Sequence, residues 1–268
     1  MLAMAAIRNM VVLTGAGISA ESGLRTFRAD DGLWEDHRVE DVAMPEAFRR
    51  DPDLVQRFYD ERRTQILAAR PNAAHEALAR LDREWPKDGS AELLIVTQNI
   101  DDLHERAGAK RVLHMHGEGL SAWCTACDAR HPWTGTLRDN PPCPSCGAPA
   151  LRPDIVWFGE MPYRMEDIFA ALSRADLFVS IGTSGAVYPA AGFVQQAKSH
   201  GARALELNLE RSQGSRWFDE TRLGRAGELV PAWVREMRDE WCGPPGDTGK
   251  HRRRDTGQCG SGGAPCQL

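Results

Sequence analysis

The chain has 268 residues, of which 42% are hydrophobic and 26% are charged. This composition is typical of an ordinary globular protein, and the length allows one substantial core with a smaller appended lobe. No apolar stretch is long enough to span a bilayer, and a formal net charge of −5 disfavours general nucleic-acid binding. Because no basic leader precedes the apolar N-terminal residues, we expect no secretory signal and a cytoplasmic protein.

Residues 10–14 form the first predicted strand, and a glycine-rich turn follows it. In VLTGAGISAESGLRTFR, at residues 12–28, the strand runs through Gly15 and Gly17 into a helix start. Because glycine has no Cβ atom, the backbone can turn sharply there, and a pyrophosphate could come close to bare N–H groups at the helix N-terminus. The turn could also be only a tight connection, since its spacing is not GxGxxG. Its place between a strand and a helix favours a nucleotide site.

Residues 29–80 contain no strand candidate. Residues 45–69 have helical spacing, and a second helix starts at residues 71–75. Tyr59 and Arg62 stand three residues apart on the first helix and therefore share a face. A guanidinium beside a phenol can bind a carboxylate, although an arginine-rich helix face is more often solvated surface.

Short apolar runs between helix-like segments continue the pattern of the first strand. They have the length and composition of buried parallel strands and lie at residues 93–97, 111–114, 176–181 and 203–208. This alternation predicts an α/β fold with a Rossmann-like, doubly wound parallel sheet.

Polar residues follow three of these strands, at the end where open α/β sheets bind their ligands. Gln98, Asn99, Ile100 and Asp101 follow the second strand. An amide and a carboxylate there could bind a ribose or a carboxamide, although one of them could equally cap the next helix. The other two sets, which could also be ordinary strand-to-helix turns, are Gly182-Thr183-Ser184 and Asn208-Leu209-Glu210.

Two histidines end the third predicted strand, in HMHGE at residues 114–118. His114 and His116 stand at positions i and i+2 of a strand, so they share a face and could bind a metal. A histidine at a strand end is more often a general base or a satisfied polar group. Since four cysteines elsewhere complete a metal site, we assign His116 as the candidate base and His114 as structural.

Two CxxC pairs, with fifteen residues between them, predict a zinc site. Four thiolates satisfy tetrahedral zinc and leave no position for water, so this zinc would be structural. Four unrelated free thiols are the alternative. The surrounding segment, residues 118–152, has little hydrophobic periodicity, so we expect that it cannot build its own core and would need a metal to fold. The four ligands are Cys124, Cys127, Cys143 and Cys146.

We therefore expect two lobes and a tail. The large Rossmann-like lobe, which would contain the nucleotide site, would comprise residues 1–28, 81–117 and 153–242. The small helical and zinc-binding lobe would comprise residues 29–80 and 118–152. Residues 243–268 are rich in glycine and lack periodicity, so we expect a disordered tail.

These motifs together resemble the sirtuin family of NAD-dependent protein lysine deacylases. They are GAGISAESGLRTFR, TQNID, HMHGE, the CxxC pairs, RPDIVWFGE, GTS and NLE, in that order. The pair Tyr59 and Arg62 is similar to that of the bacterial class III members. The resemblance implies that NAD and an acyl-lysine protein or peptide enter a cleft between the lobes, and that nicotinamide and O-acyl-ADP-ribose are released.

The resemblance also implies a role for each matched residue. His116 and Asn99 would be catalytic, with His116 taking a proton from a ribose hydroxyl. Tyr59 and Arg62 would favour succinyl or malonyl groups over acetyl, and Ala43 would leave room for the longer chain. The remaining substrate contacts would be Val156, Phe158, Gly159 and Val187. NAD would contact Gly15, Ala16, Gly17, Ser19, Glu21, Thr26, Phe27, Arg28, Trp34, Gln98, Asn99, Ile100, Asp101, Gly182, Thr183, Ser184, Asn208, Leu209, Glu210 and Ala226.

Three other functions fit part of the pattern. The same cofactor could serve protein ADP-ribosylation or hydride transfer, and the cysteine segment could be a zinc-ribbon interaction module on an α/β scaffold. Residues 118–152 carry three arginines against three acidic residues, which argues against stable nucleic-acid binding. We expect a monomer with no membrane partner.

Overall fold

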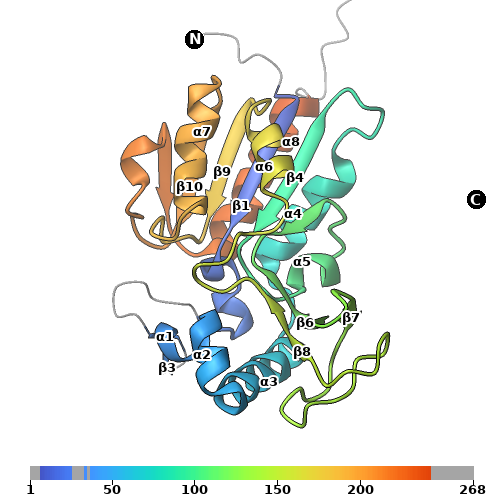
Figure 1. Ribbon diagram of the computed structural model, residues 1–268. Helices are drawn as coiled ribbons and strands as arrows, with labels where there is room; N and C mark the ends of the chain where they lie inside the picture. Colours follow the sequence, from blue (N-terminus) through green and yellow to red (C-terminus); the bar gives the residue numbers. More distant parts are fainter. Residues whose placement is uncertain (1–6, 26–32, 35–36, 243–268) are drawn as a thin grey trace, which may run out of the picture.

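The computed structural model describes residues 7–25, 33–34 and 37–242. Its centre is a six-stranded sheet in the order β11-β10-β9-β1-β4-β5, in which every neighbouring pair is parallel (Figure 1). The strands are β1 (Asn9–Thr14), β4 (Glu92–Thr97), β5 (Val112–His114), β9 (Leu177–Ile181), β10 (Arg203–Asn208) and β11 (Glu220–Leu223). The predicted α/β sheet is confirmed.

Five of the six strands occupy the predicted apolar runs. Strand β1 explains why these runs are almost wholly apolar, since Met10 and Val12 enter one hydrophobic cluster while Val11 and Leu13 enter another. Successive side chains point to opposite faces of a strand, and both faces of this sheet are covered. The edge strand β11 was not predicted, because its sequence Glu-Thr-Arg-Leu is only partly buried and lacks such a run.

Helices cover the two faces of the sheet. On one face, α4 (Ala73–Glu84) and α8 (Ala226–Cys242) pack into the first cluster; on the other, α6 (Met165–Leu172) and α7 (Phe193–Ser199) pack into the second. Among the helices of the described residues, none combines the length and the apolar character that crossing a bilayer requires.

The order of the strands reverses beside β1. The chain builds β1, β4 and β5 outward on one side, and later builds β9, β10 and β11 outward on the other. The connections that follow β1 and β9 therefore lead toward opposite sides of the sheet. Such a switch point, at the carboxyl edge, is where a doubly wound fold binds its ligand.

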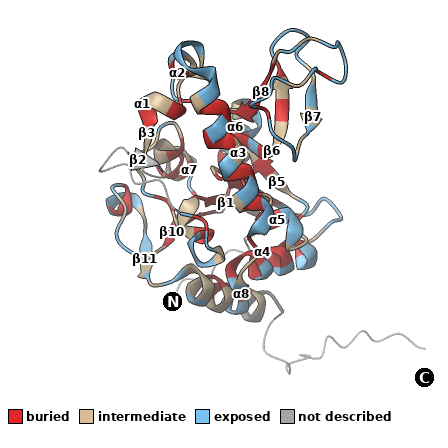
Figure 2. Ribbon diagram, turned by 90° about the horizontal axis from the view of Figure 1, so that it is seen from below, coloured by how far each residue is buried: buried red, intermediate tan, exposed pale blue. Residues whose placement is uncertain are grey.

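A second group of elements lies beyond this carboxyl edge (Figure 1). Its helices are α1 (Val39–Val42), α2 (Pro45–Arg50) and α3 (Pro52–Ala68), and α3 has a buried and an exposed face (Figure 2). Its sheet has the order β7-β6-β8, formed by β6 (Gly117–Cys124), β7 (Arg130–Pro132) and β8 (Leu151–Ile155).

Three expectations for this region were wrong. Residues 29–80 do contain strands, since β2 (Leu33–Trp34) pairs with β3 (His37–Arg38). The cysteine segment does build a small core, in which Ala122 and Leu137 pack with two of its own cysteines. Strand β8 runs past residue 152 and pairs with β6, so residues 153–155 belong to the small sheet. Short strands with mixed composition leave no clear period in the sequence.

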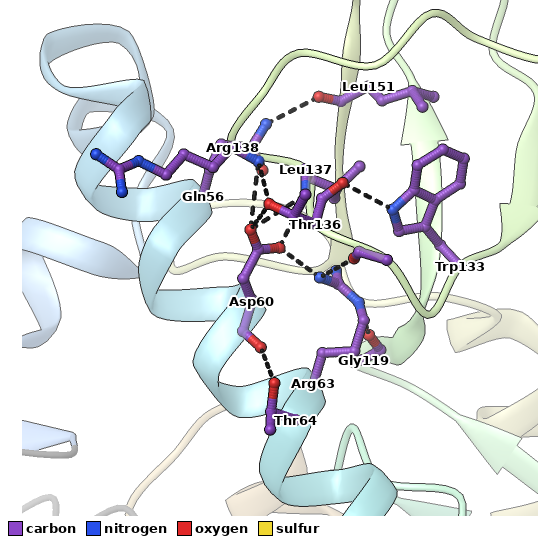
Figure 3. Close-up of polar contacts among 11 residues, drawn as sticks. Gln56, Asp60, Arg63, Thr64, Gly119, Trp133, Thr136, Leu137, Arg138 and Leu151 are labelled. Carbon is purple, nitrogen blue, oxygen red and sulfur yellow. Dashed lines mark hydrogen bonds and ion pairs between the residues drawn. The ribbon is translucent and has the colours of Figure 1, made fainter.

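Polar contacts join α3 to the cysteine segment (Figure 3). The carboxylate of Asp60 accepts from the Leu137 amide at 3.0 Å and pairs with Arg63 at 2.6 Å. The Arg63 side chain, 2% exposed, also donates to the carbonyl oxygens of Gly119 and Gly135. These contacts fix the helix that carries the predicted carboxylate receptor.

Candidate active site

The glycine turn after β1 lies against the loop after β9. A Cβ atom on Gly15 would come within 2.8 Å of the Gly182 carbonyl oxygen, and one on Gly17 within 2.7 Å of the Gly182 Cα. The amides of Gly15 and Gly17 donate to the carbonyls of Ile181 and Gly182 at 3.0 and 2.9 Å. These two N–H groups are therefore satisfied within the fold. The glycines are required because two backbones pack together at the switch point.

A buried polar cluster adjoins this turn. The side-chain amide of Asn99 donates to the Gly15 carbonyl at 3.2 Å and to the Ser19 hydroxyl at 3.1 Å. The Ser19 hydroxyl in turn donates to the Asp101 carboxylate at 3.0 Å. Burial raises the pKa of Asp101. Asp101 also accepts from the backbone amide of Leu103 at 3.2 Å, but the residue at the N-cap position of the next helix is Asp102. The predicted amide and carboxylate thus meet at the carboxyl ends of β1 and β4.

Two histidines that were not predicted as site residues support this cluster. The backbone amide of Asn72 donates to Nδ1 of His75 at 3.3 Å, so the ring hydrogen of His75 is on Nε2. This Nε2 lies 3.4 Å from the Ser19 hydroxyl. Nε2 of His104 lies 3.0 Å from the Thr14 hydroxyl. Burial lowers the pKa of His75 to about 4 and that of His104 well below its usual value. Both imidazoles are therefore neutral. In the sequence, the position of each histidine on the apolar face of a predicted helix could have indicated that it is buried.

His116 follows β5 in the form that a general base requires. Its Nδ1 lies 3.1 Å from the Gln98 carbonyl oxygen, which can only accept, so Nδ1 carries the hydrogen and Nε2 keeps its lone pair. Burial lowers the pKa of His116, which keeps the ring neutral. The two nitrogens of His114 instead contact Glu105 at 2.9 Å and the Asn99 carbonyl at 3.2 Å. These contacts support the structural role predicted for His114.

Tyr59 and Arg62 are buried in the structure, at 2% and 5% exposure, so the solvated-surface alternative was wrong. The Tyr59 hydroxyl lies 3.0 Å from the indole nitrogen of Trp157. The Arg62 guanidinium donates to the side-chain oxygen of Gln65 at 2.8 Å. Burial raises the pKa of the Tyr59 phenol, which keeps it protonated.

The segment after β8 joins this pair to His116. The amide of Val156 donates to the His116 carbonyl at 2.9 Å, and the amide of Phe158 donates to the Ala43 carbonyl at 3.0 Å. Ala43 and Tyr59 share one hydrophobic cluster. The structure therefore brings the predicted base, the small residue and the predicted peptide-contacting segment together.

Other residues predicted to contact NAD lie along the same edge. The Asn208 side chain donates to the Thr183 carbonyl at 2.7 Å and links the loops after β10 and β9. Glu21 accepts from the Gly227 amide at 2.7 Å and so holds the start of α8, where Ala226 lies. Thr26, Phe27 and Arg28 lie outside the described residues, and the backbone of Trp34 forms part of β2. Ser184, Leu209 and Glu210 are exposed, whereas Ala16, Gln98, Ile100 and Val187 are half-buried.

The four predicted zinc ligands converge. Their Sγ atoms all lie within 4.8 Å of one another, and the pairs Cys124–Cys146 and Cys127–Cys143 are separated by 3.7 and 3.8 Å. Sulfurs bound tetrahedrally at about 2.3 Å from zinc would lie about 3.8 Å apart, whereas a disulfide requires about 2.05 Å. The four cysteines fit a closed zinc site with no position for water.

The fold and this site define a class: α/β proteins that bind a dinucleotide at the switch point of a parallel sheet and carry a zinc-binding module beside it. The model of the Sir2 family matches residues 15–189. The NAD-dependent protein deacylase of Yersinia pseudotuberculosis is 60% identical over 231 residues, which cover 85% of this chain and 82% of that protein. The protein of the same name from Vibrio parahaemolyticus is 56% identical over 233 residues, covering 86% and 95%.

Solved structures of Sir2 proteins have the same fold as this chain. A Sir2 homologue in complex with NAD has a TM-score of 0.77 and 39% identity, covering 86% of this chain and 89% of that one. Sir2 bound to acetylated peptide has a TM-score of 0.72 and 30% identity, covering 86% and 93%. The chain belongs to the Sir2 family, as its motifs predict.

Proposed function

We propose that this chain, an NAD-dependent protein deacylase of the Sir2 family, removes succinyl and malonyl groups from lysine in preference to acetyl groups. The names of its relatives and the NAD and acetylated-peptide complexes of similar structures support the general activity. The buried pair Tyr59 and Arg62 carries the proposed preference.

A succinyl or malonyl group ends in a carboxylate, and an acetyl group does not. A charge-assisted hydrogen bond to Arg62 is worth about 1.5–3 kcal/mol, which corresponds to roughly 10- to 150-fold in kcat/KM. Because Tyr59 stays protonated, its hydroxyl can donate a second bond to the same carboxylate. Ala43 leaves space at this site because its side chain is a single methyl group.

The residues at the carboxyl edge fit a bound dinucleotide. Ser19, Asn99 and Asp101 form a buried polar surface beside the switch point and would hold the nicotinamide half. The loops linked by Asn208 would hold the adenosine half. When bound, NAD supplies the ribose that takes the acyl group and the nicotinamide that leaves. His116 accepts a proton at Nε2 from a hydroxyl of that ribose.

The remaining expectations form part of the same proposal. The zinc held by the four cysteines is structural, because all four positions of a tetrahedral ion are filled. The substrates are proteins or peptides with acylated lysines. We further propose that the protein works in the cytoplasm as a monomer, without nucleic acid, and that the division into two lobes separates NAD binding from zinc binding.

The variant Arg62→Met tests the proposed preference. We expect kcat/KM for a succinyl-lysine peptide to fall at least tenfold relative to that for the matching acetyl-lysine peptide, measured by mass spectrometry with NAD. Arg57→Met removes an exposed arginine from the same helix and serves as the matched control, with the ratio unchanged. Equal losses on both peptides in Arg62→Met would remove Arg62 as the selector.

A further inference from the structure

The hydrogen bond between Trp157 and Tyr59 has a defined direction. The indole nitrogen lies 3.0 Å from the phenol oxygen, and both side chains are 2% exposed. An indole N–H can only donate, so the phenol oxygen must accept. The hydroxyl hydrogen of Tyr59 therefore points away from Trp157.

The indole is itself held in place on several sides. The Arg152 guanidinium lies 3.5 Å from the centre of the Trp157 ring, and Arg152 pairs with Glu160 at 2.8 Å. Glu160 also accepts from the backbone amide of Trp157 at 2.8 Å. The Phe48 ring packs against the indole with a centroid separation of 5.3 Å. Because these contacts fix the ring, the direction of its N–H is fixed too.

We propose that Trp157 is a positioning residue for acyl selection: its indole N–H orients the Tyr59 hydroxyl so that the hydroxyl donates to the carboxylate of a succinyl or malonyl group. The inference rests on the proposed preference for acidic acyl groups. Trp157 lies between Val156 and Phe158, so the segment predicted to contact the peptide also sets the chemistry of the acyl pocket. An acetyl group has no carboxylate and gains nothing from this orientation.

Trp157→Phe tests the proposal, because it removes the N–H donor while keeping an aromatic ring against Arg152 and Tyr59. The loss of one hydrogen bond predicts a fall of about 3- to 10-fold in the ratio of kcat/KM for succinyl-lysine to that for acetyl-lysine. We expect most of the change in KM for the succinyl peptide. A benzothienylalanine at position 157, which replaces the N–H by sulfur in a ring of nearly the same shape, should give the same change if Trp157→Phe does not fold.

Trp123→Phe is the matched control. The Trp123 ring also faces the Arg152 guanidinium, at 4.9 Å, but its indole N–H donates to Asp128 at 2.7 Å. The same substitution there should leave the selectivity ratio unchanged, with zinc content measured to confirm an intact module.

A double-mutant cycle with Tyr59→Phe separates positioning from general structural damage. Once the phenol oxygen is absent, Trp157→Phe should change the selectivity ratio no further. A further loss of similar size in the Tyr59→Phe background, or an equal loss on both peptides, would overturn the inference. If Arg62→Met also loses no selectivity, the proposed preference itself fails. If Arg62→Met does and Trp157→Phe does not, only the role of Trp157 fails.

Discussion

His116 obtains its chemistry from its surroundings and not from its type alone. An exposed imidazole has a pKa near 6.5 and exists in two tautomers, but the Gln98 carbonyl selects one tautomer by accepting from Nδ1. Burial lowers the pKa, because the charged ring loses hydration. A neutral ring with its lone pair on Nε2 is the state that can accept a proton.

The pH dependence of activity should reflect this environment. The proposed base, His116, accepts a proton only when neutral, and burial lowers its pKa. Activity should therefore persist at pH 6.5 and fall only as the pH drops through a value below 6.5. An acetyl-lysine peptide is the appropriate substrate, since its acyl group does not titrate. The profile of kcat/KM between pH 5 and 8 would measure the acidic midpoint. A midpoint above 6.5 would contradict this account of His116.

Single residues were predicted best where their chemistry is evident from type and spacing. The four cysteines belong to this group, because their sulfur atoms converge as predicted. The role of Trp157 was not evident, because its partner Tyr59 lies 98 positions away in the chain. His75 and His104 were missed for the same reason, since their rings lie 5.0 Å apart although they come from different helices. Such contacts depend on tertiary packing, which one sequence does not encode locally.

At the scale of elements, α3 has two functional sides. Tyr59 and Arg62 belong to the proposed acyl site, whereas Asp60 and Arg63 attach the helix to the cysteine segment (Figure 3). The position of the carboxylate receptor therefore depends on contacts with a zinc-binding module that is distant in sequence.

Asp60→Asn should destabilise the protein. The substitution leaves the Arg63 guanidinium buried without its carboxylate, and breaking a buried pair in this way costs about 3 kcal/mol. Asp53→Asn is the matched control. Asp53 pairs with Arg138 and so links the same helix to the same segment, but the two side chains are 53% and 50% exposed. Exposed pairs of this kind contribute little. Urea unfolding of the two variants measures both effects; equal midpoints would contradict the importance of the Asp60 contacts.

Elements were predictable in proportion to their apolar content. Strands β1, β4, β5, β9 and β10 lie between covered faces and read as apolar runs. Strand β11 and the small strands β2, β3 and β7 are short or polar, so neither period nor composition marks them. The position of the glycine turn between a strand and a helix made it predictable as a candidate site. The reason that the turn needs glycine, close packing against Gly182, is evident only in the structure.

At the scale of the whole molecule, three distant parts of the chain meet in one site. The segment after β8 is bonded to His116 on one side and to Ala43 on the other. His116 comes from the carboxyl edge of the large sheet, and Ala43 comes from the helical region. This arrangement explains how the proposed base and the proposed acyl site come together beside the carboxyl edge of the large sheet.

We expect the unmodified protein to act as an NAD-dependent deacylase that prefers acidic acyl groups. The most direct measurement is mass-spectrometric turnover of acetyl-, malonyl- and succinyl-lysine peptides of one sequence by the unmodified protein, with and without NAD. We expect that turnover requires NAD and that kcat/KM for the succinyl and malonyl peptides exceeds that for the acetyl peptide at least tenfold. An acetyl peptide that is turned over as well as or better than the other two would contradict it.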